Sequence, residues 1–197
     1  MSETLADADA GKVEYIDIVR VNGDNDVGKN IDIIQHYFAE KRGVETLNCR
    51  SDLKPNELNA YLPYIEILAP ITVCHAGCEQ VEDAKFRLVG TKLDALHGEA
   101  TGKLMSEIWD DDALAAFCGA MNYCTKKKAA AVFCSPALLF GRTNLKIAYL
   151  MVPFKGEDGN VCQFLVFADI CRVGLAGEHL TGDNLPDPLG GYSILNF

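Results

Sequence analysis

Positive charge is scarce in this chain of 197 residues. Its 18 lysines and arginines stand against 28 aspartates and glutamates, which gives a formal net charge of −10. Nucleic-acid binding depends on clustered basic side chains, so the balance argues against a nucleic-acid-binding surface. It also disfavours docking on an anionic membrane. An acidic surface of this kind suits protein partners that carry basic patches.

Long apolar runs are missing as well. The most apolar stretches, IAYLMVPF and CQFLVFADI, are far shorter than the roughly 18 residues of a membrane-spanning helix. The opening MSETLADADAGK has neither the basic start nor the apolar core of a secretory signal. We therefore expect a cytoplasmic protein without membrane insertion, whose eight cysteines stay reduced and mostly act as small buried hydrophobes.

Catalytic motifs are also lacking. The sequence contains no G-x-S-x-G, no P-loop, no G-x-G-x-x-G and no H-E-x-x-H. The acidic run 110–112 resembles a metal triplet, but it opens a helical pattern that ends in the lysines 126–128. The helix dipole favours this distribution of charge, so both runs have a structural explanation. We expect neither an enzyme nor a metal site.

What the sequence does contain is a succession of short strands and helices. Alternating apolar residues predict strands at 64–68 and 84–90. Three further apolar segments predict strands at 131–140, 144–154 and 160–170, the last two joined by the hairpin signal KGEDGN. Helical spacing predicts helices over 31–42 and 110–129, with short helices within 91–108. Residues 71–84 have the composition of a polar connection. The fold class is therefore α+β, with a five-stranded antiparallel sheet and short helices on one face.

The domain limits follow from composition. Residues 1–30 are expected to be a leader and linker, residues 31–172 one domain with an N-terminal flanking helix, and residues 173–197 a Gly- and Pro-rich C-terminal tail. The flanking helix carries an apolar stripe that packs either on the domain or on a second copy. We expect it to form a homodimer interface through Ile31, Ile34, Tyr37 and Phe38.

The order of elements, β-β-α-α-α-β-β-β, resembles that of a PAS domain. Matching stretches are DLKP before the first strand, LPYIEIL, FRLVGT, HGEATGKLMSEI, and VPF…DGN in the last hairpin. Over residues 31–170 the chain is similar to the short single-domain PAS proteins of alphaproteobacteria. The resemblance implies that residues 86–108 form the second strand and the short helices that roof a pocket over the sheet.

The same resemblance implies a non-catalytic signalling protein. It would be a stand-alone sensor or adaptor that binds signalling proteins such as histidine kinases, in bacterial motility or cell-cycle regulation. A small apolar ligand is a further expected partner. The pocket would be lined by Phe86, Leu88, Leu104, Trp109, Phe117, Met121, Tyr149, Met151 and Phe164. The alternative is an enzyme that uses the same pocket through Tyr123, Tyr149 or Asp169.

Three segments raise the question of a cofactor. Some PAS domains bind haem through one histidine, for which His97 is the candidate, although a polar turn residue explains it better. Residues 48–50, Asn-Cys-Arg, imitate a flavin-reactive motif but precede the first strand. Cys74, His75 and Cys78 provide three ligands, whereas structural zinc sites take four. We expect no required cofactor.

Overall fold

The computed structural model describes residues 14–15, 29–75, 77–136, 145–173 and 179–180. Within these ranges, the body of one sheet has the order β5 (Ala131–Pro136), β6 (Leu145–Lys155), β7 (Val161–Val173), β3 (Ile65–His75) and β4 (Cys78–Val89). All neighbours in this body are antiparallel. The two-residue strands β1 (Glu14–Tyr15), β2 (Asn48–Cys49) and β8 (His179–Leu180) pair with β5, β6 and β7. The predicted α+β class and five-stranded antiparallel sheet are confirmed, with three short strands added.

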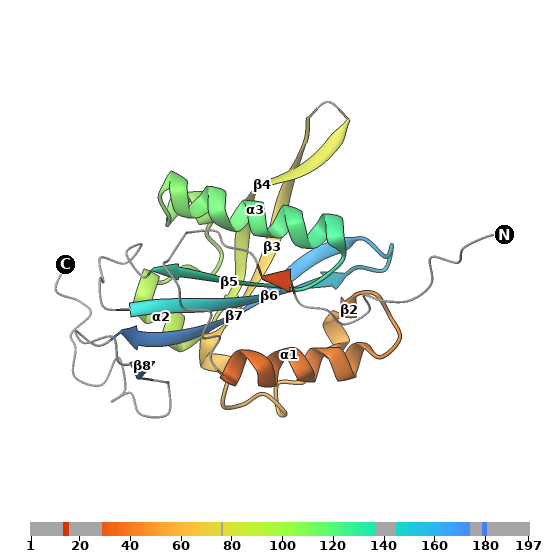
Figure 1. Ribbon diagram of the computed structural model, residues 1–197. Helices are drawn as coiled ribbons and strands as arrows, with labels where there is room; N and C mark the ends of the chain where they lie inside the picture. Colours follow the sequence, from red (N-terminus) through yellow and green to blue (C-terminus); the bar gives the residue numbers. More distant parts are fainter. Residues whose placement is uncertain (1–13, 16–28, 76, 137–144, 174–178, 181–197) are drawn as a thin grey trace.

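Helices lie on both sides of this sheet. The described helices are α1 (Lys29–Arg42), α2 (Thr91–His97) and α3 (Asp111–Lys127), and the 3₁₀ turns are η1 (Arg50–Asp52), η2 (Leu62–Tyr64) and η3 (Met105–Glu107). Figure 1 shows α3 and α1 on opposite sides of the sheet. The predicted helices over 31–42 and 110–129 are confirmed, as are the short helical segments within 91–108.

The central strands are buried on both faces. Along β6, Tyr149 and Met151 point toward α3, while Leu150 and Val152 point toward α1. Successive side chains of a strand point to opposite faces, so one apolar run fills two cores. We call the set on the α2–α3 side the inner core and the set on the α1 side the outer core. Inner-core members include Leu68, Phe86, Leu93, Met105, Phe117, Met121, Phe133, Phe164 and Val166; outer-core members include Ile65, Ile67, Leu165 and Phe167.

The structure corrects the expected dimer interface on α1. Ile31, Ile34 and Phe38 are buried in the outer core of their own chain, where the Phe38 ring lies 5.6 Å from that of Phe154. Tyr37 is half-buried, and its hydroxyl donates to the Asp52 carbonyl at 2.9 Å. The stripe was correctly identified as apolar, but the outer face of the sheet already covers it. A second copy therefore has no access to Ile31, Ile34 or Phe38.

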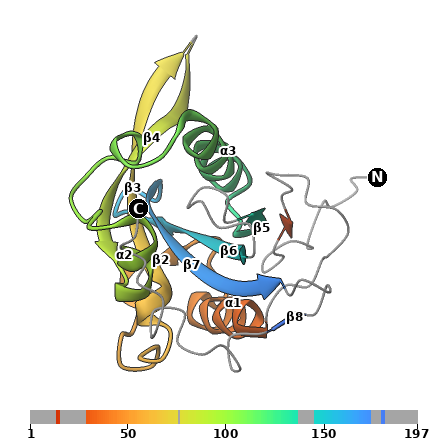
Figure 2. The ribbon, with the colours of Figure 1, turned by 90° about the vertical axis from the view of Figure 1, so that its left-hand side faces the viewer.

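The first two strands are longer than predicted. Their pairing continues to His75 opposite Cys78, so residues 71–84 are mostly strand rather than a polar connection. β7 pairs with β3 only from Ile65 to Leu68. Beyond that point the hairpin projects past α3, as both ribbon views show (Figures 1 and 2). We call residues 71–80 the arm; the side chains that the structure describes in it are exposed.

One amide side chain fixes α3 to the base of the arm. Asn122 Oδ1 accepts the Val81 N–H at 2.7 Å, and Asn122 Nδ2 donates to the Val81 carbonyl at 3.0 Å. The amide therefore satisfies the edge of β4 as a neighbouring strand would. At the start of α3, the Asp110 carboxylate accepts the Ala113 N–H at 2.8 Å. This bond confirms that the acidic run caps the helix.

Replacing Ile34 by alanine should lower the free energy of unfolding by about 2–5 kcal/mol, because it leaves a cavity in the outer core. Chemical denaturation measures the change. The matched control is Ile33→Ala on the same helix, where the side chain is 46% exposed and the change should stay within about 0.5 kcal/mol. Equal losses in the two variants would contradict the packing of α1 on the sheet.

Candidate functional site

Aromatic rings run through the inner core in an unbroken series. The ring centroids are 5.7 Å apart for His97 and Phe86, 5.5 Å for Phe86 and Trp109, 4.4 Å for Trp109 and Phe117, and 5.0 Å for Phe117 and Tyr149. These residues come from α2, β4, the residues before α3, α3 itself and β6. Ring contacts of this kind add to the stabilisation from burial. They hold together elements that are distant in the sequence.

A carboxylate and an imidazole meet inside this aromatic core. Glu66 lies on β3 between Val89 of β4 and Val166 of β7, and His97 is the last residue of α2. His97 Nε2 lies 2.7 Å from Glu66 Oε1, and both side chains are 3% exposed. Burying a carboxylate costs several kcal/mol unless it is paired and hydrogen-bonded. The pair therefore differs from the ordinary apolar packing of this core and needs a separate explanation.

Two further polar atoms beside the pair are buried. Within the part of the chain that the structure describes, Glu66 Oε2 and Trp109 Nε1 have no hydrogen-bond partner. The first is an acceptor and the second a donor, and the centroid of the Trp109 ring lies 6.1 Å from that of His97. Each unmet polar atom costs about 1–3 kcal/mol. The inner core thus contains one acceptor and one donor that could bind a polar group from outside the described residues.

Tyr149 completes the polar surroundings of Glu66. Burial raises the pKa of its hydroxyl, and the negative charge of Glu66 raises that pKa further. The phenol therefore stays protonated at physiological pH and is unsuited to act as a base. Asp169, a second candidate of the enzyme hypothesis, pairs in register with Ala148 of the outer core, and its Oδ1 accepts from Asn30 Nδ2 at 3.3 Å. Tyr149 and Asp169 lie on opposite faces of the sheet and form no common site.

Most of the predicted lining residues lie together. Phe86, Trp109, Phe117, Met121, Tyr149, Met151 and Phe164 all belong to the inner core or pack against it. Leu104 is half-buried, and its backbone forms an isolated antiparallel β-bridge with Lys85 of β4. Whether any of these side chains touches a ligand stays a prediction.

Leu88 is the exception in this set. A register shift places Leu88 opposite Ile67 but Phe86 opposite Leu68, which leaves Arg87 as the extra residue of a bulge. Leu88 consequently points to the outer face and is exposed. The expectation that Phe86 and Leu88 share one face is wrong, because strict alternation fails across a bulge.

Sequence reasoning missed Glu66, although a signal was present. In YIEIL, alternation places Glu66 on the same face as Leu68, which is an inner-core position. A charged residue at an inward position of a central strand indicates a partner inside the core. That partner, His97, is 31 residues away along the chain.

His97 does not fit the haem hypothesis. Its Nε2 is held by the Glu66 carboxylate, and the rings of Phe86 and Trp109 lie against the imidazole. A haem iron bound through Nε2 would have to displace both the carboxylate and this packing. His97 is also not a polar turn residue, because it belongs to α2 and its side chain is buried.

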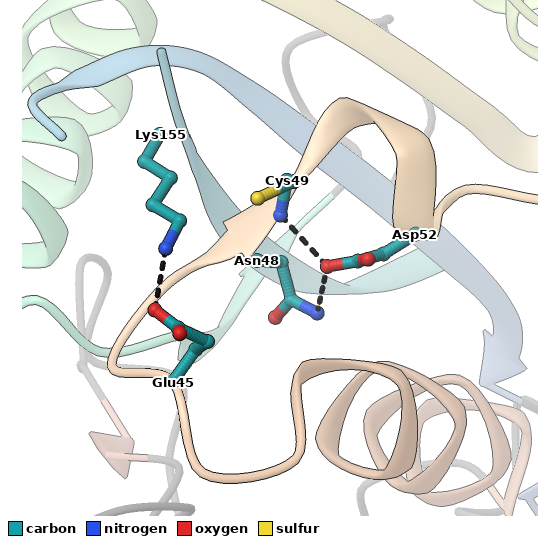
Figure 3. Close-up of polar contacts among 5 residues, drawn as sticks. All are labelled: Glu45, Asn48, Cys49, Asp52 and Lys155. Carbon is teal, nitrogen blue, oxygen red and sulfur yellow. Dashed lines mark hydrogen bonds and ion pairs between the residues drawn. The ribbon is translucent and has the colours of Figure 1, made fainter. Parts of the chain in front are cut away.

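The Asn-Cys-Arg segment belongs to the α1 layer. Asn48 donates through Nδ2 to the Phe38 carbonyl of α1 at 2.8 Å. Figure 3 shows that Asn48 Nδ2 also donates to Asp52 Oδ2, at 3.3 Å, and that the same Oδ2 accepts the Cys49 N–H at 2.7 Å. Nearby, Lys155 Nζ lies 2.6 Å from Glu45 Oε2. These contacts join α1, β2 and β6. The segment has a structural role and lies away from the inner core.

The cysteines of the arm do not face one another. Cys74 pairs in register with Glu79, and Cys78 with His75, so Cys74 and Cys78 lie on opposite faces of the hairpin. One ion cannot be bound by both. A search of the described residues finds no group of three or more His, Cys, Asp or Glu side chains placed to hold a metal.

Thiol reactivity tests the burial of α3. Burial raises the pKa of Cys118 to about 11 and that of Cys124 to about 12, whereas Cys74 and Cys78 are exposed. The thiolate is the reactive form, so iodoacetamide at pH 7.5 should label the arm cysteines and spare Cys118 and Cys124 in the native protein. Labelled peptides are quantified by mass spectrometry, with urea-unfolded protein as the control. Native labelling of Cys124 as fast as Cys74 would contradict the packing of α3.

The comparisons with known proteins agree with this architecture. The family model for the PAS domain matches residues 29–167, from the start of α1 into β7, and so covers both cores. No curated protein and no solved structure matches the chain. None of the described helices is long and apolar enough to cross a membrane. By the extent of the family match, which takes in most of its length, the chain belongs to the PAS domain family.

Proposed function

We propose that this PAS protein is a non-catalytic signalling adaptor that acts by binding a partner protein, with histidine kinases as the expected class. Membership of the PAS family indicates a signalling or sensory role. The motifs DLKP and FRLVGT support a cytoplasmic protein of alphaproteobacterial motility or cell-cycle signalling, through the resemblance that they carry. The observation that carries the adaptor function is an apolar surface on the β3–β4 hairpin.

Three large apolar side chains are exposed on the outer face of this hairpin. Ile71 is 40% exposed, Val73 39% and Leu88 41%. Ile71 and Val73 follow the outer-core residue Ile67 at even spacing on the same strand, and Leu88 pairs with Ile67 in register, so all three face the same way. We call them the outer strip. Contiguous apolar side chains on a protein surface mark interaction sites.

The outer strip has no cover among the described elements. The outer-core partners of α1 on the sheet are mainly residues of β6 and β7, whereas Ile71 and Val73 lie beyond Leu68, where β3 leaves β7. Figure 2 shows the hairpin extending past α3 and away from α1. A projecting hairpin can reach a partner without disturbing either core.

Charge supports a basic partner. Between Pro70 and Ala84 the chain carries Glu79, Glu82 and Asp83 and no lysine or arginine. The exposed Lys85, opposite Ala69, is the basic residue on the outer face between Ile71 and Leu88. Complementary charge raises the rate of encounter and selects among partners, while apolar contact sets how long they stay together. We therefore expect the partner surface to combine apolar side chains with lysine or arginine.

An enzyme is the second candidate, and the Glu66–His97 contact is the observation that favours it. A carboxylate that orients an imidazole is a common arrangement of a general base. Turnover requires a substrate to enter and a product to leave in every cycle, yet both side chains are 3% exposed and the rings of Phe86 and Trp109 pack against His97. This enclosure favours the non-catalytic interpretation.

The double substitution Ile71→Ser and Val73→Ser should weaken kinase binding about tenfold or more, because it removes most of the outer strip. The full chain is immobilised, and purified histidine kinases of the same organism are passed over it in biolayer interferometry. At least one kinase should bind the wild-type chain. The matched control is Ile33→Ser, which removes an exposed apolar side chain from α1 and should leave the Kd unchanged. Binding that is equal for all three proteins, or the absence of binding by every kinase, would refute the adaptor function.

A further inference from the structure

We propose that Glu66, His97 and Trp109 form a subsite for a small aromatic molecule that carries an amide-like edge, with an N–H donor next to a carbonyl acceptor. The inference deepens the proposed function and rests on its sensory part, since it names the ligand class of the inner core. It does not depend on the outer strip.

The two unused polar atoms determine which polar groups the ligand needs. The contact with His97 occupies Glu66 Oε1 and leaves Oε2 as the acceptor that a ligand N–H would meet. Trp109 Nε1 is the donor that a ligand carbonyl would meet. The His97 ring contacts both residues, at 2.7 Å from Nε2 to Oε1 and at 6.1 Å between ring centroids. An amide, a lactam or the edge of a nucleobase offers both a donor and an acceptor on one small molecule.

The charge of Glu66 restricts the ligand further. Electrostatic interactions are strong where water is excluded, so a second carboxylate beside Glu66 is strongly disfavoured. Tyr149, which feels the charge of Glu66, stays neutral because its pKa is raised. The ligand is therefore neutral or cationic at the edge that meets Glu66.

The surrounding rings favour an aromatic body. Phe86 stacks on His97 with an interplanar angle of 27°, and Trp109 meets both rings edge-on. An added ring in such an environment gains offset-stacked or edge-to-face contacts. His97 ends α2, and Trp109 lies two residues before the start of α3. Both side chains therefore stand at helix ends, where small backbone shifts leave the ladders of the sheet intact.

The chain supplies its own reporter for a test. Trp109 is the single tryptophan, so the tryptophan emission of the full chain reports on this subsite alone. Benzamide is the probe, since it has the aromatic body and the donor–acceptor edge. Benzoate keeps the body but is an anion without a donor, and toluene has no polar group. Benzamide should give a saturable change in emission, with a Kd at least tenfold lower than those of benzoate and toluene.

A pair of variants ties the response to the residue. Glu66→Gln should weaken benzamide binding at least fivefold, and Glu79→Gln on the exposed arm should leave it unchanged. If Glu66→Gln does not fold, the series of three probes on the wild-type chain decides by itself. Equal responses to all three probes would mean unspecific apolar binding. The absence of a saturable benzamide response would mean that water alone meets these atoms. Either result, or an unchanged Kd in a folded Glu66→Gln variant, overturns the proposal.

The same titration separates this proposal from the adaptor function. The Ile71→Ser and Val73→Ser variant keeps the whole inner core and should bind benzamide like the wild-type chain. Loss of kinase binding with a normal benzamide response leaves the subsite proposal standing. Normal kinase binding without a benzamide response refutes the subsite alone.

Discussion

Burial of both faces of β6 and β7 is the constraint on which the rest of the structure depends. Their side chains alternate between an inner and an outer core, so neither strand offers a face to water over its central residues. A sheet of this kind is stable only when other elements cover both sides. The helix α1 covers one side, and α2, η3 and α3 cover the other, which explains why the PAS match begins at α1 rather than at the first long strand.

Two kinds of residue depart from this burial pattern and indicate function: a carboxylate inside the inner core and apolar side chains exposed on the hairpin. Glu66 is a carboxylate at an inward position of a strand whose neighbours on that face are apolar, and it is paired there with His97. Ile71 and Val73 are apolar residues on the outer face of the hairpin, beyond the last outer-core residue of β3. The first exception lies inside the molecule and suits a small ligand. The second lies outside and suits a protein partner. β3 carries both, so one strand runs from the proposed sensory region to the proposed binding surface.

Much of the fold could be predicted from local patterns. The helix 110–129 has the apolar stripe of a helix buried on one face, and the strands 144–154 and 160–170 have the continuous apolar runs of strands buried on both faces. The capping role of the acidic run followed from the helix dipole alone. Seven of the nine expected lining residues meet in the inner core for the same reason: they occupy the inward positions of elements that were correctly assigned.

The errors arose where no local rule decides. A bulge at Arg87 turns Leu88 outward, and no residue in FRLVG indicates that a bulge forms there. The stripe on α1 showed that something covers Ile31 and Ile34, but not that the chain's own sheet does so. The arm was taken for a connection because strands that leave the core lose the alternation that burial imposes. Glu66 was missed because its partner is distant in the sequence, although its inward position was visible.

Amide hydrogen exchange on the full chain, followed by mass spectrometry, tests most directly whether two cores hold a rigid sheet from which the arm stands free. Exchange should be slowest in β6 and β7, which are covered on both faces, and faster by orders of magnitude for residues 72–80 of the arm. Slow exchange in the arm equal to that of β6, or rapid exchange throughout β7, would contradict the account.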